Sequence, residues 1–251
     1  MEEKKYLKWY NKVGYGSGDL AANCIYALLT SFVMIYLTDT VGLNAGIIGT
    51  LIMFSKFADG ITDVFFGNLI DKTKSKMGKA RPWMLYAQIG NCILLVAVFA
   101  IPASLGKTAQ YAYFFITYTL LNAVFYTANN IAYASLTSLI TRNGNERVQM
   151  GSIRFMFSLA TNIIVQSITV GLVTNFGGGA EGWRTVAIIY AIIAFIVNAI
   201  SVFSVKELPP EEMGTENTES SEEKISFIES MKLLLKNKYF LMIAAFYILT
   251  Y

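Results

Sequence analysis

The hydrophobic residues of this chain fall into long blocks that short polar segments separate. Six of these blocks reach roughly 20 residues, the length that a helix needs to cross a hydrocarbon layer of about 30 Å. The pattern predicts six membrane-spanning helices, at residues 14–38, 46–70, 83–102, 111–138, 148–174 and 183–205. A seventh apolar run begins near Tyr239 and reaches Tyr251 before it is long enough to cross. We therefore expect the sequence to stop within a helix.

The composition supports this pattern. Charged residues make up 15% of the chain, against about 25% in a typical soluble domain. The mean hydropathy is +0.48. There is no histidine, and both cysteines, Cys24 and Cys92, fall inside apolar blocks, so we expect neither a disulfide framework nor a metal site. The sequence predicts an all-α membrane protein.

Most of the 20 Lys and Arg residues lie on one side of the predicted spans. They occur in the N-terminal segment and after the second, fourth and sixth spans. Because basic residues are more frequent on the cytoplasmic side, these segments are predicted to be cytoplasmic. The expected location is the cell membrane, crossed several times, with the N-terminus in the cytoplasm and with lipid as a partner.

The segment 206–231 is a long polar stretch that is acidic and carries two prolines. It is typical of a solvated linker, with a phospho-regulated tail as the alternative. The predicted organisation is an N-terminal six-helix bundle at 1–205, a cytoplasmic linker at 206–236 and the start of a seventh helix at 237–251.

The second predicted span contains Lys56, Asp59 and Asp63. A charged side chain at the centre of a bilayer costs roughly 2.5–3.5 kcal/mol on insertion scales. Asp59 and Asp63 share one helix face with Thr62 and Lys56 because they lie four positions apart. Three explanations remain open: a bound Na⁺ or H⁺ neutralises the pair, a structural ion pair forms with Lys56 or Arg154, or the groups pack against partner helices.

Three other predicted spans carry a polar stripe at helical spacing. The stripes consist of Asp19, Asn23, Tyr26 and Thr30 in span one, of Tyr118, Asn122, Tyr126, Asn129, Asn130 and Tyr133 in span four, and of Arg154, Ser158, Thr161, Asn162 and Thr169 in span five. Such faces are costly against lipid, so we expect them to converge on an interior cavity. Hydroxyls, amides and charges suit a neutral polyhydroxylated ligand. A single Asn or Tyr is more often a contact between helices.

Other function classes fit the sequence poorly. "GYGSGD" at 14–19 lacks the strand and the spacing of a nucleotide-binding loop. The basic loop 72–81 follows from membrane topology, so we expect no nucleic-acid partner. We find no nucleophile paired with a base and no cluster of metal ligands, and so predict that the protein is not an enzyme and needs no cofactor.

Four segments carry a family resemblance. "GNLIDKTKSKMGKARPW" resembles the loop between helices two and three of major facilitator superfamily transporters, in a longer form similar to that of the glycoside–pentoside–hexuronide:cation symporters. "KVGYGSGDLAANCIY", "YLTDTVGLNAGIIGTLIMFSKFADGITD" and "YTANNIAYASL" resemble the first, second and fourth helices of the same family. The resemblance implies twelve helices in two halves, of which this chain would be the N-terminal half without its C-terminal partner half.

The resemblance also implies roles for individual residues. The cation-binding residues are Asp59, Asp63, Thr62 and Thr127, with Lys56 as a charged neighbour. Asp19 and Arg154 match sugar-contacting positions, and the stripes add Asn23, Tyr26, Tyr126 and Asn130. The cytoplasmic loop motif consists of Gly67, Asp71, Gly78, Lys79 and Arg81. Asn130 and Ala134 stand where melibiose-type members carry an acidic residue and a tryptophan, which points toward the xyloside and glucuronide branches.

We therefore predict secondary active symport of a sugar or glycoside with Na⁺, Li⁺ or H⁺ by alternating access. Two alternatives stay open. The first is a transporter of the same fold for a drug, lipid or carboxylate. The second is a membrane scaffold or a non-functional truncated product.

Overall fold

The computed structural model describes residues 4–209, 212, 236–238 and 241–242. The chain divides into two compact units, Met1–Leu208 and Pro209–Tyr251. The predicted linker at 206–236 and the predicted seventh helix at 237–251 lie largely outside the described residues. The first unit holds every residue for which a role was predicted.

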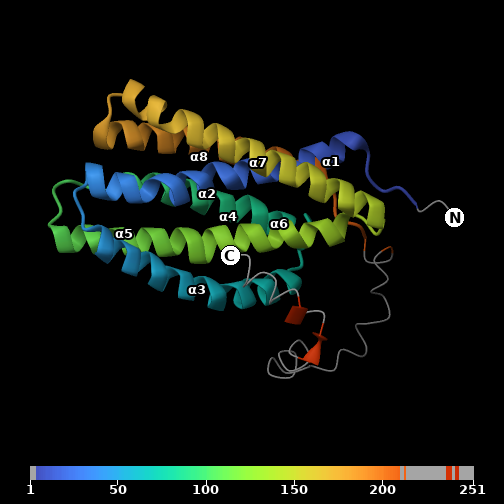
Figure 1. Cartoon of the computed structure of the whole chain (residues 1–251). Helices are drawn as coiled ribbons and strands as arrows, with labels where there is room; N and C mark the ends of the chain where they lie inside the picture. Colours follow the sequence, from blue (N-terminus) through green and yellow to red (C-terminus); the bar gives the residue numbers. More distant parts are fainter. Residues whose placement is uncertain (1–3, 210–211, 213–235, 239–240, 243–251) are drawn as a thin grey trace. The chain divides into compact units, whose positions relative to one another are not determined.

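The first unit is an all-helical bundle (Figure 1). Its elements in chain order are α1 (Trp9–Gly16), α2 (Gly18–Ile35), the π-helical segment η1 (Tyr36–Thr40), α3 (Ala45–Asp71), α4 (Arg81–Val98), α5 (Lys107–Thr119), the π-helical segment η2 (Leu120–Tyr126), α6 (Thr127–Ile140), α7 (Gly144–Asn175) and α8 (Gly179–Ser204). Consecutive elements join into six long runs, because α1, α2 and η1 follow one another closely, as do α5, η2 and α6. These runs confirm the six-helix prediction.

The observed ends differ from the predicted ones by a few residues. The first run begins at Trp9 rather than at residue 14, since hydropathy alone does not register its polar first turns. The third ends at Val98 rather than at 102, where Pro102 cannot continue a helix. Within the described ranges, four helices are long and apolar enough to cross a membrane. They are Trp9–Thr40, α3, α7 and α8.

Local sequence explains where α3 and α7 begin. The Asn44 side chain accepts hydrogen bonds from the backbone N–H groups of Gly46 and Ile47, at 2.9 and 3.3 Å. Asn143 accepts one from the N–H of Glu146 at 3.1 Å. An Asn at the position before a helix satisfies N–H groups that have no partner within the helix.

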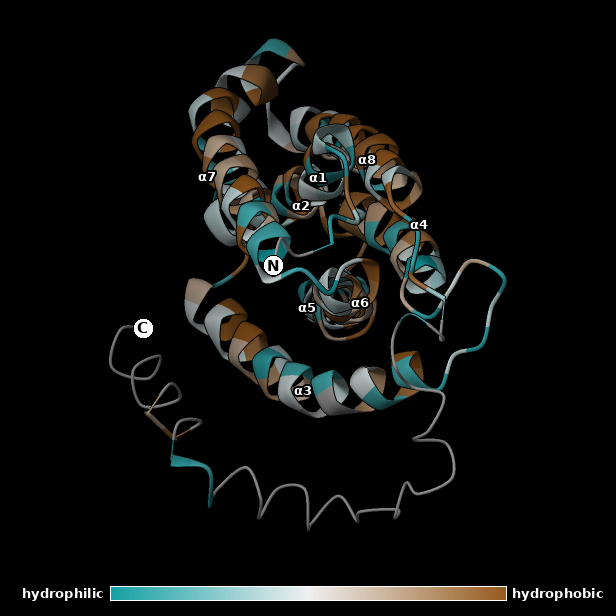
Figure 2. Ribbon diagram, turned by 90° about the vertical axis from the view of Figure 1, so that its right-hand side faces the viewer, coloured by the Kyte–Doolittle hydropathy of each residue, from teal (hydrophilic) through white to brown (hydrophobic). Residues whose placement is uncertain are grey.

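The helices differ in how far they are buried. Only 12% of the most apolar stretch of α3 and 22% of that of α7 are buried, against 56% for the first run and 44% for α8. Figure 2 views the bundle end-on and shows α3 and α7 on separate flanks, with α2, α5 and α6 between them. α3 packs against α5, η2 and α6, while α7 packs against α1, α2 and α8. The predicted polar stripes of spans one and four therefore lie on helices between α3 and α7, and the stripe of span five lies on α7 itself.

We call the end of the bundle where α1, α4 and α7 begin its N-terminal end. There the buried Glu146 carboxylate accepts hydrogen bonds from the N–H groups of Tyr6 and Leu7, at 3.3 and 3.1 Å. The Thr141 hydroxyl donates to the same carboxylate at 2.7 Å, and Lys12 lies 3.4 Å away. Glu146 therefore fastens the segment before α1 to the start of α7.

Candidate functional site

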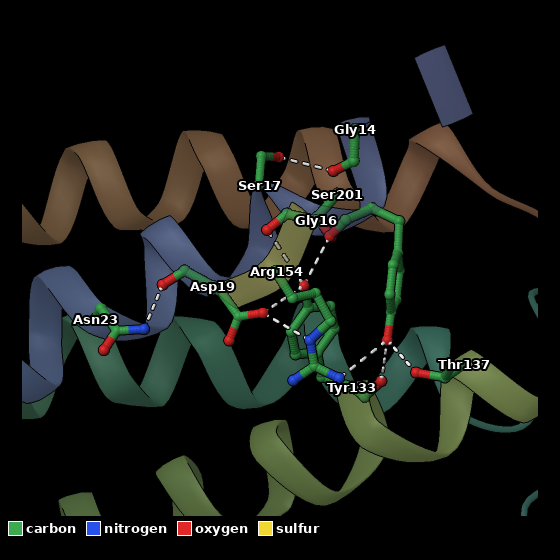
Figure 3. Close-up of polar contacts among 10 residues, drawn as sticks. Gly14, Gly16, Ser17, Asp19, Asn23, Tyr133, Thr137, Arg154 and Ser201 are labelled. Atoms are coloured by element: carbon green, nitrogen blue, oxygen red, sulfur yellow. Dashed lines mark hydrogen bonds and ion pairs between the residues drawn. The ribbon is translucent and has the colours of Figure 1, made fainter. Parts of the chain in front are cut away.

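The centre of the candidate site is an ion pair between the first and fifth runs. Nε of Arg154 on α7 lies 2.6 Å from Oδ2 of Asp19 on α2 (Figure 3). The two side chains are 24% and 16% exposed, so each is largely removed from solvent. Asp19 lies in the first turn of α2, directly after its junction with α1.

Two tyrosines complete this cluster. The Arg154 guanidinium lies over the Tyr133 ring at 4.1 Å and farther from the Tyr15 ring, at 5.9 Å. The Tyr133 hydroxyl is 3.1 Å from Oδ2 of Asp19 and 2.8 Å from the backbone oxygen of Tyr15. The two rings are 4.7 Å apart. Aromatic stacking and hydrogen bonds thus hold both charges in one orientation.

A glycine explains how the helices come so close. A Cβ atom added at Gly18 would lie 2.8 Å from both Oγ of Ser201 on α8 and Cε2 of Tyr133. Ser201 also donates a hydrogen bond to the Tyr15 backbone oxygen at 2.9 Å. The "GYGSGD" segment is therefore a close-packing site at the start of α2, as small residues often are in membrane helices.

The polar face continues along α2 and α7. Nδ2 of Asn162 donates to Oδ1 of Asn23 at 2.8 Å, and Nδ2 of Asn23 donates to the Asp19 backbone oxygen at 2.7 Å. The Tyr26 ring stacks on the Tyr126 ring, with centroids 5.7 Å apart and planes at 22°. Asn130 is exposed, one turn beyond Tyr126. The structure thus brings Asp19, Arg154 and Asn23 into one network and pairs Tyr26 with Tyr126.

The predicted cation-binding residues lie on α3 and at the start of α6. Nζ of Lys56 is 3.0 Å from Oδ2 of Asp59, with side-chain exposures of 49% and 22%. Of the three explanations for these charges, the structure shows the ion pair with Lys56, whereas Arg154 pairs with Asp19. Asp63 is exposed, and its carboxylate interacts with the Thr127 side chain.

The two threonine hydroxyls of this predicted set bond to backbone. Thr62 donates to the backbone oxygens of Ala58 and Asp59 at 3.1 and 3.0 Å. Thr127 donates to that of Asn122 at 3.0 Å. A hydroxyl oxygen keeps acceptor capacity while it donates. These bonds therefore leave the prediction that both bind a cation untested.

The predicted loop motif forms a helix-end contact. The Glu207 carboxylate, just after α8, accepts hydrogen bonds from the N–H groups of Lys79, Ala80 and Arg81, at 2.6, 2.9 and 3.1 Å. Gly78 has φ +110, and a Cβ there would clash with the Glu207 carboxylate. Nε of Arg81 donates to the backbone oxygen of Val202 at 2.9 Å. Asp71 ends α3 at the surface and Gly67 lies within α3.

Comparison with known proteins identifies the family to which this chain belongs. Residues 14–251 match the family described as MFS/sugar transport protein. The chain belongs to this family. Its similarity to glycoside–pentoside–hexuronide:cation symporters, stated above from four sequence segments, is confirmed.

Similarity to individual proteins supports this family assignment. The chain is 34% identical over 240 residues to the isoprimeverose transporter of Lactiplantibacillus pentosus, covering 93% of this chain and 48% of the relative. It is 32% identical over 256 residues to the uncharacterized symporter YnaJ of Bacillus subtilis, covering 100% and 53%. It is 30% identical over 242 residues to the putative glycoside/cation symporter YagG of Escherichia coli, covering 96% and 50%. The chain spans about half the length of the curated relatives it matches.

Sequence reasoning about this MFS sugar-transport chain missed several residues of the site. Tyr15 was not selected, and Tyr133 and Asn162 were recognised only as members of stripes. Glu207 was assigned to the predicted linker, and Glu146 was not selected. For Tyr133 the signal was present, since it continues the helical spacing of the stripe in span four. The two glutamates contact segments more than a hundred residues away, and no local pattern indicates such partners.

Proposed function

We propose that the full-length protein containing this chain couples the movement of a cation to the uptake of a sugar or glycoside. The observation that carries the proposal is the ion pair of Asp19 and Arg154 within an apolar bundle, bordered by amides and an aromatic pair. In a protein of the sugar-transport family, this arrangement suits a ligand with many hydroxyl groups.

The ion pair retains capacity to bind such a ligand. The described contacts of the Asp19 carboxylate are all made by Oδ2. Of the five N–H donors of a guanidinium, the Arg154 contacts in the described part of the chain involve Nε and Nη1. The Asp19 carboxylate can accept hydrogen bonds from sugar hydroxyls, and the remaining N–H groups of Arg154 can donate to sugar oxygens; such charge-assisted bonds are stronger than bonds between neutral groups. The stacked rings of Tyr26 and Tyr126 offer an apolar surface for a sugar ring.

The cation is expected on the second run. Asp59 and Asp63 share one face of α3, where Lys56 supplies a single positive charge. A bound Na⁺, Li⁺ or H⁺ neutralises the remaining carboxylate. Each ligand should then raise the affinity of the other, because coupling between two sites is reciprocal. Alternating access follows when a second half supplies the opposite wall of the cavity, as in transporters with binding sites at the bilayer midplane.

Substitution of Asp59 tests the proposal. In proteoliposomes with the full-length protein, Asp59→Asn should abolish stimulation of sugar uptake by Na⁺, Li⁺ or a proton gradient, because the amide carries no charge. Asp39→Asn, at an exposed carboxylate in η1, is the matched control and should retain it. Normal cation dependence in Asp59→Asn contradicts the proposal. Uptake that favours a lipid or an organic anion over sugars contradicts the substrate class.

A further inference from the structure

The first helical run is interrupted directly before Asp19. α1 ends at Gly16 and α2 begins at Gly18, and Ser17 between them lies in a turn. Gly and Ser pairs are common at such breaks, and residues 16–18 read Gly-Ser-Gly. The last backbone oxygens of a helix have no N–H partner within that helix. The end of α1 therefore needs other hydrogen-bond donors, within one turn of the Asp19 carboxylate.

Hydroxyl groups supply such donors at the end of α1. The Ser17 hydroxyl donates to the Gly14 backbone oxygen at 2.7 Å. The Tyr15 backbone oxygen accepts two hydrogen bonds from other helices, at 2.9 Å from Ser201 on α8 and at 2.8 Å from Tyr133 on α6 (Figure 3). Two neighbouring helices thus fasten the end of α1.

The Tyr133 hydroxyl also contacts the candidate sugar site. It lies 2.8 Å from the Tyr15 oxygen, 3.1 Å from Oδ2 of Asp19 and 3.4 Å from the Gly16 oxygen. A hydroxyl has a single proton to donate, so a stronger bond to one acceptor weakens the bonds to the others. A charged acceptor forms the stronger bond. The Asp19 carboxylate and the backbone of α1 therefore compete for one proton.

A ligand on Asp19 changes this competition. Oδ2 of Asp19 already accepts a hydrogen bond from Nε of Arg154 at 2.6 Å, and sugar hydroxyls that donate to the carboxylate share the rest of its charge. The Tyr133 ring is held in place, since it is 2% exposed and lies 4.1 Å from the guanidinium and 4.7 Å from the Tyr15 ring. Its hydroxyl responds by turning its proton from Asp19 to the Tyr15 oxygen.

We propose that Tyr133 is a positioning residue that connects the sugar site to the junction of α1 and α2. The proposal rests on the proposed function and adds a conformational response to it. With sugar on Asp19, the Tyr133 hydroxyl donates to the Tyr15 oxygen and the junction becomes more rigid. Without sugar, the hydroxyl donates to Asp19 and the junction opens more often.

Hydrogen–deuterium exchange of the backbone amides of residues 14–20 tests the proposal in the purified full-length protein. The probes are methyl β-xyloside and methyl β-glucuronide, whose binding is measured separately by calorimetry. A glycoside that binds should slow exchange by roughly 2–10-fold, which corresponds to one additional neutral hydrogen bond. Tyr133→Phe keeps the ring beneath Arg154 but lacks the hydroxyl, so the glycoside should no longer slow exchange.

Glycoside affinity distinguishes a positioning role from a direct sugar contact. Tyr133→Phe removes the bond to Asp19 from the unliganded protein and the bond to the Tyr15 oxygen from the liganded protein. The bond to the carboxylate is the stronger one, so glycoside affinity should be unchanged or up to roughly tenfold higher. A direct sugar contact of the hydroxyl requires the opposite change, a lower affinity.

Two matched variants separate this connection from packing. Tyr190→Phe removes a buried hydroxyl on α8 that is 2.9 Å from the Thr169 hydroxyl, and the glycoside should still slow exchange. Ser201→Ala removes the other donor to the Tyr15 oxygen. Its exchange should be faster with and without glycoside, but the slowing by glycoside should persist. Thermal unfolding of every variant verifies that it remains folded.

Four outcomes overturn the inference. The first is slowing by glycoside that persists in Tyr133→Phe or is absent from the unchanged protein, and the proposed function stands if the glycoside still binds. The second is loss of the slowing in Tyr190→Phe, which indicates a general effect of packing. The third is a lower glycoside affinity in Tyr133→Phe. The fourth is a protein that binds neither glycoside, which contradicts the proposed function as well.

Discussion

The contact between Glu207 and the start of α4 gives a prediction whose size follows from the structure. Lys79, Ala80 and Arg81 present three backbone N–H groups that a helix cannot satisfy internally, and the Glu207 carboxylate accepts all three at 2.6–3.1 Å. In Glu207→Gln, the amide nitrogen faces one N–H donor, and the other two bonds lose their charge. A hydrogen bond to a charged group contributes roughly 1.5–3 kcal/mol, against about 0.5–1.5 kcal/mol for a neutral one.

For a fully buried contact, these values predict that Glu207→Gln lowers the free energy of unfolding by about 3 kcal/mol. Glu207 is half-buried, and solvent compensates part of the loss, so we expect about 1.5 kcal/mol. At about 2–4 °C per kcal/mol for a domain of this size, the unfolding temperature should fall by about 3–6 °C. A thiol-reactive fluorescent dye can follow unfolding, because Cys24 is buried and Cys92 is half-buried.

Two further variants make this test specific. Lys206→Gln changes the charge at the adjacent exposed residue and should leave the unfolding temperature unchanged. Gly78→Ala should lower it by a similar amount to Glu207→Gln, since a Cβ would displace the carboxylate and φ +110 strains any other residue. If Glu207→Gln unfolds at the temperature of the unchanged protein, the three hydrogen bonds do not stabilise the fold and the reasoning is refuted.

Three other predictions concern the bundle and the site. Arg154→Lys keeps the charge but replaces the five N–H donors of the guanidinium with three; the loss of one hydrogen bond from this charged group to a sugar oxygen costs about 1.5–3 kcal/mol, so sugar affinity in a binding assay should fall by roughly 10–150-fold, and an unchanged affinity speaks against this role. Gly18→Ala should destabilise the protein by about 1–3 kcal/mol in thermal unfolding, because its Cβ would crowd Ser201. Glu146→Gln weakens the contacts that hold Tyr6 and Leu7, so trypsin should cleave the N-terminal segment faster, and equal cleavage rates would count against the contact.

The sequence predicted the helical runs well because a bilayer imposes a simple rule on length and hydropathy. All six predicted spans correspond to helical runs in the described residues. The π-helical segment at Leu120–Tyr126 was not predicted. In this segment Asn122 donates a side-chain hydrogen bond to the Tyr118 backbone oxygen, and Thr127 donates one to that of Asn122. Asn and Thr make such bonds in ordinary α-helices too. Hydrophobic periodicity does not distinguish the two geometries.

The candidate site was predicted in part. Periodicity correctly placed Asp19 and Asn23 on one helix face, and the cost of buried charge indicated that they need partners. Which partner each charge takes depends on helix packing, and the alternative of pairing Arg154 with Asp59 was not realised, since Arg154 pairs with Asp19.

The reciprocal effect of cation and sugar on each other's binding tests the central claim most directly. The affinity of the purified full-length protein for its preferred sugar should be measured calorimetrically with and without saturating Na⁺ or Li⁺, and the affinity for the cation with and without sugar. The account predicts that each ligand tightens the other by the same factor, since binding linkage is reciprocal. A sugar affinity that does not change with the cation, or a protein that binds neither ligand, would contradict it.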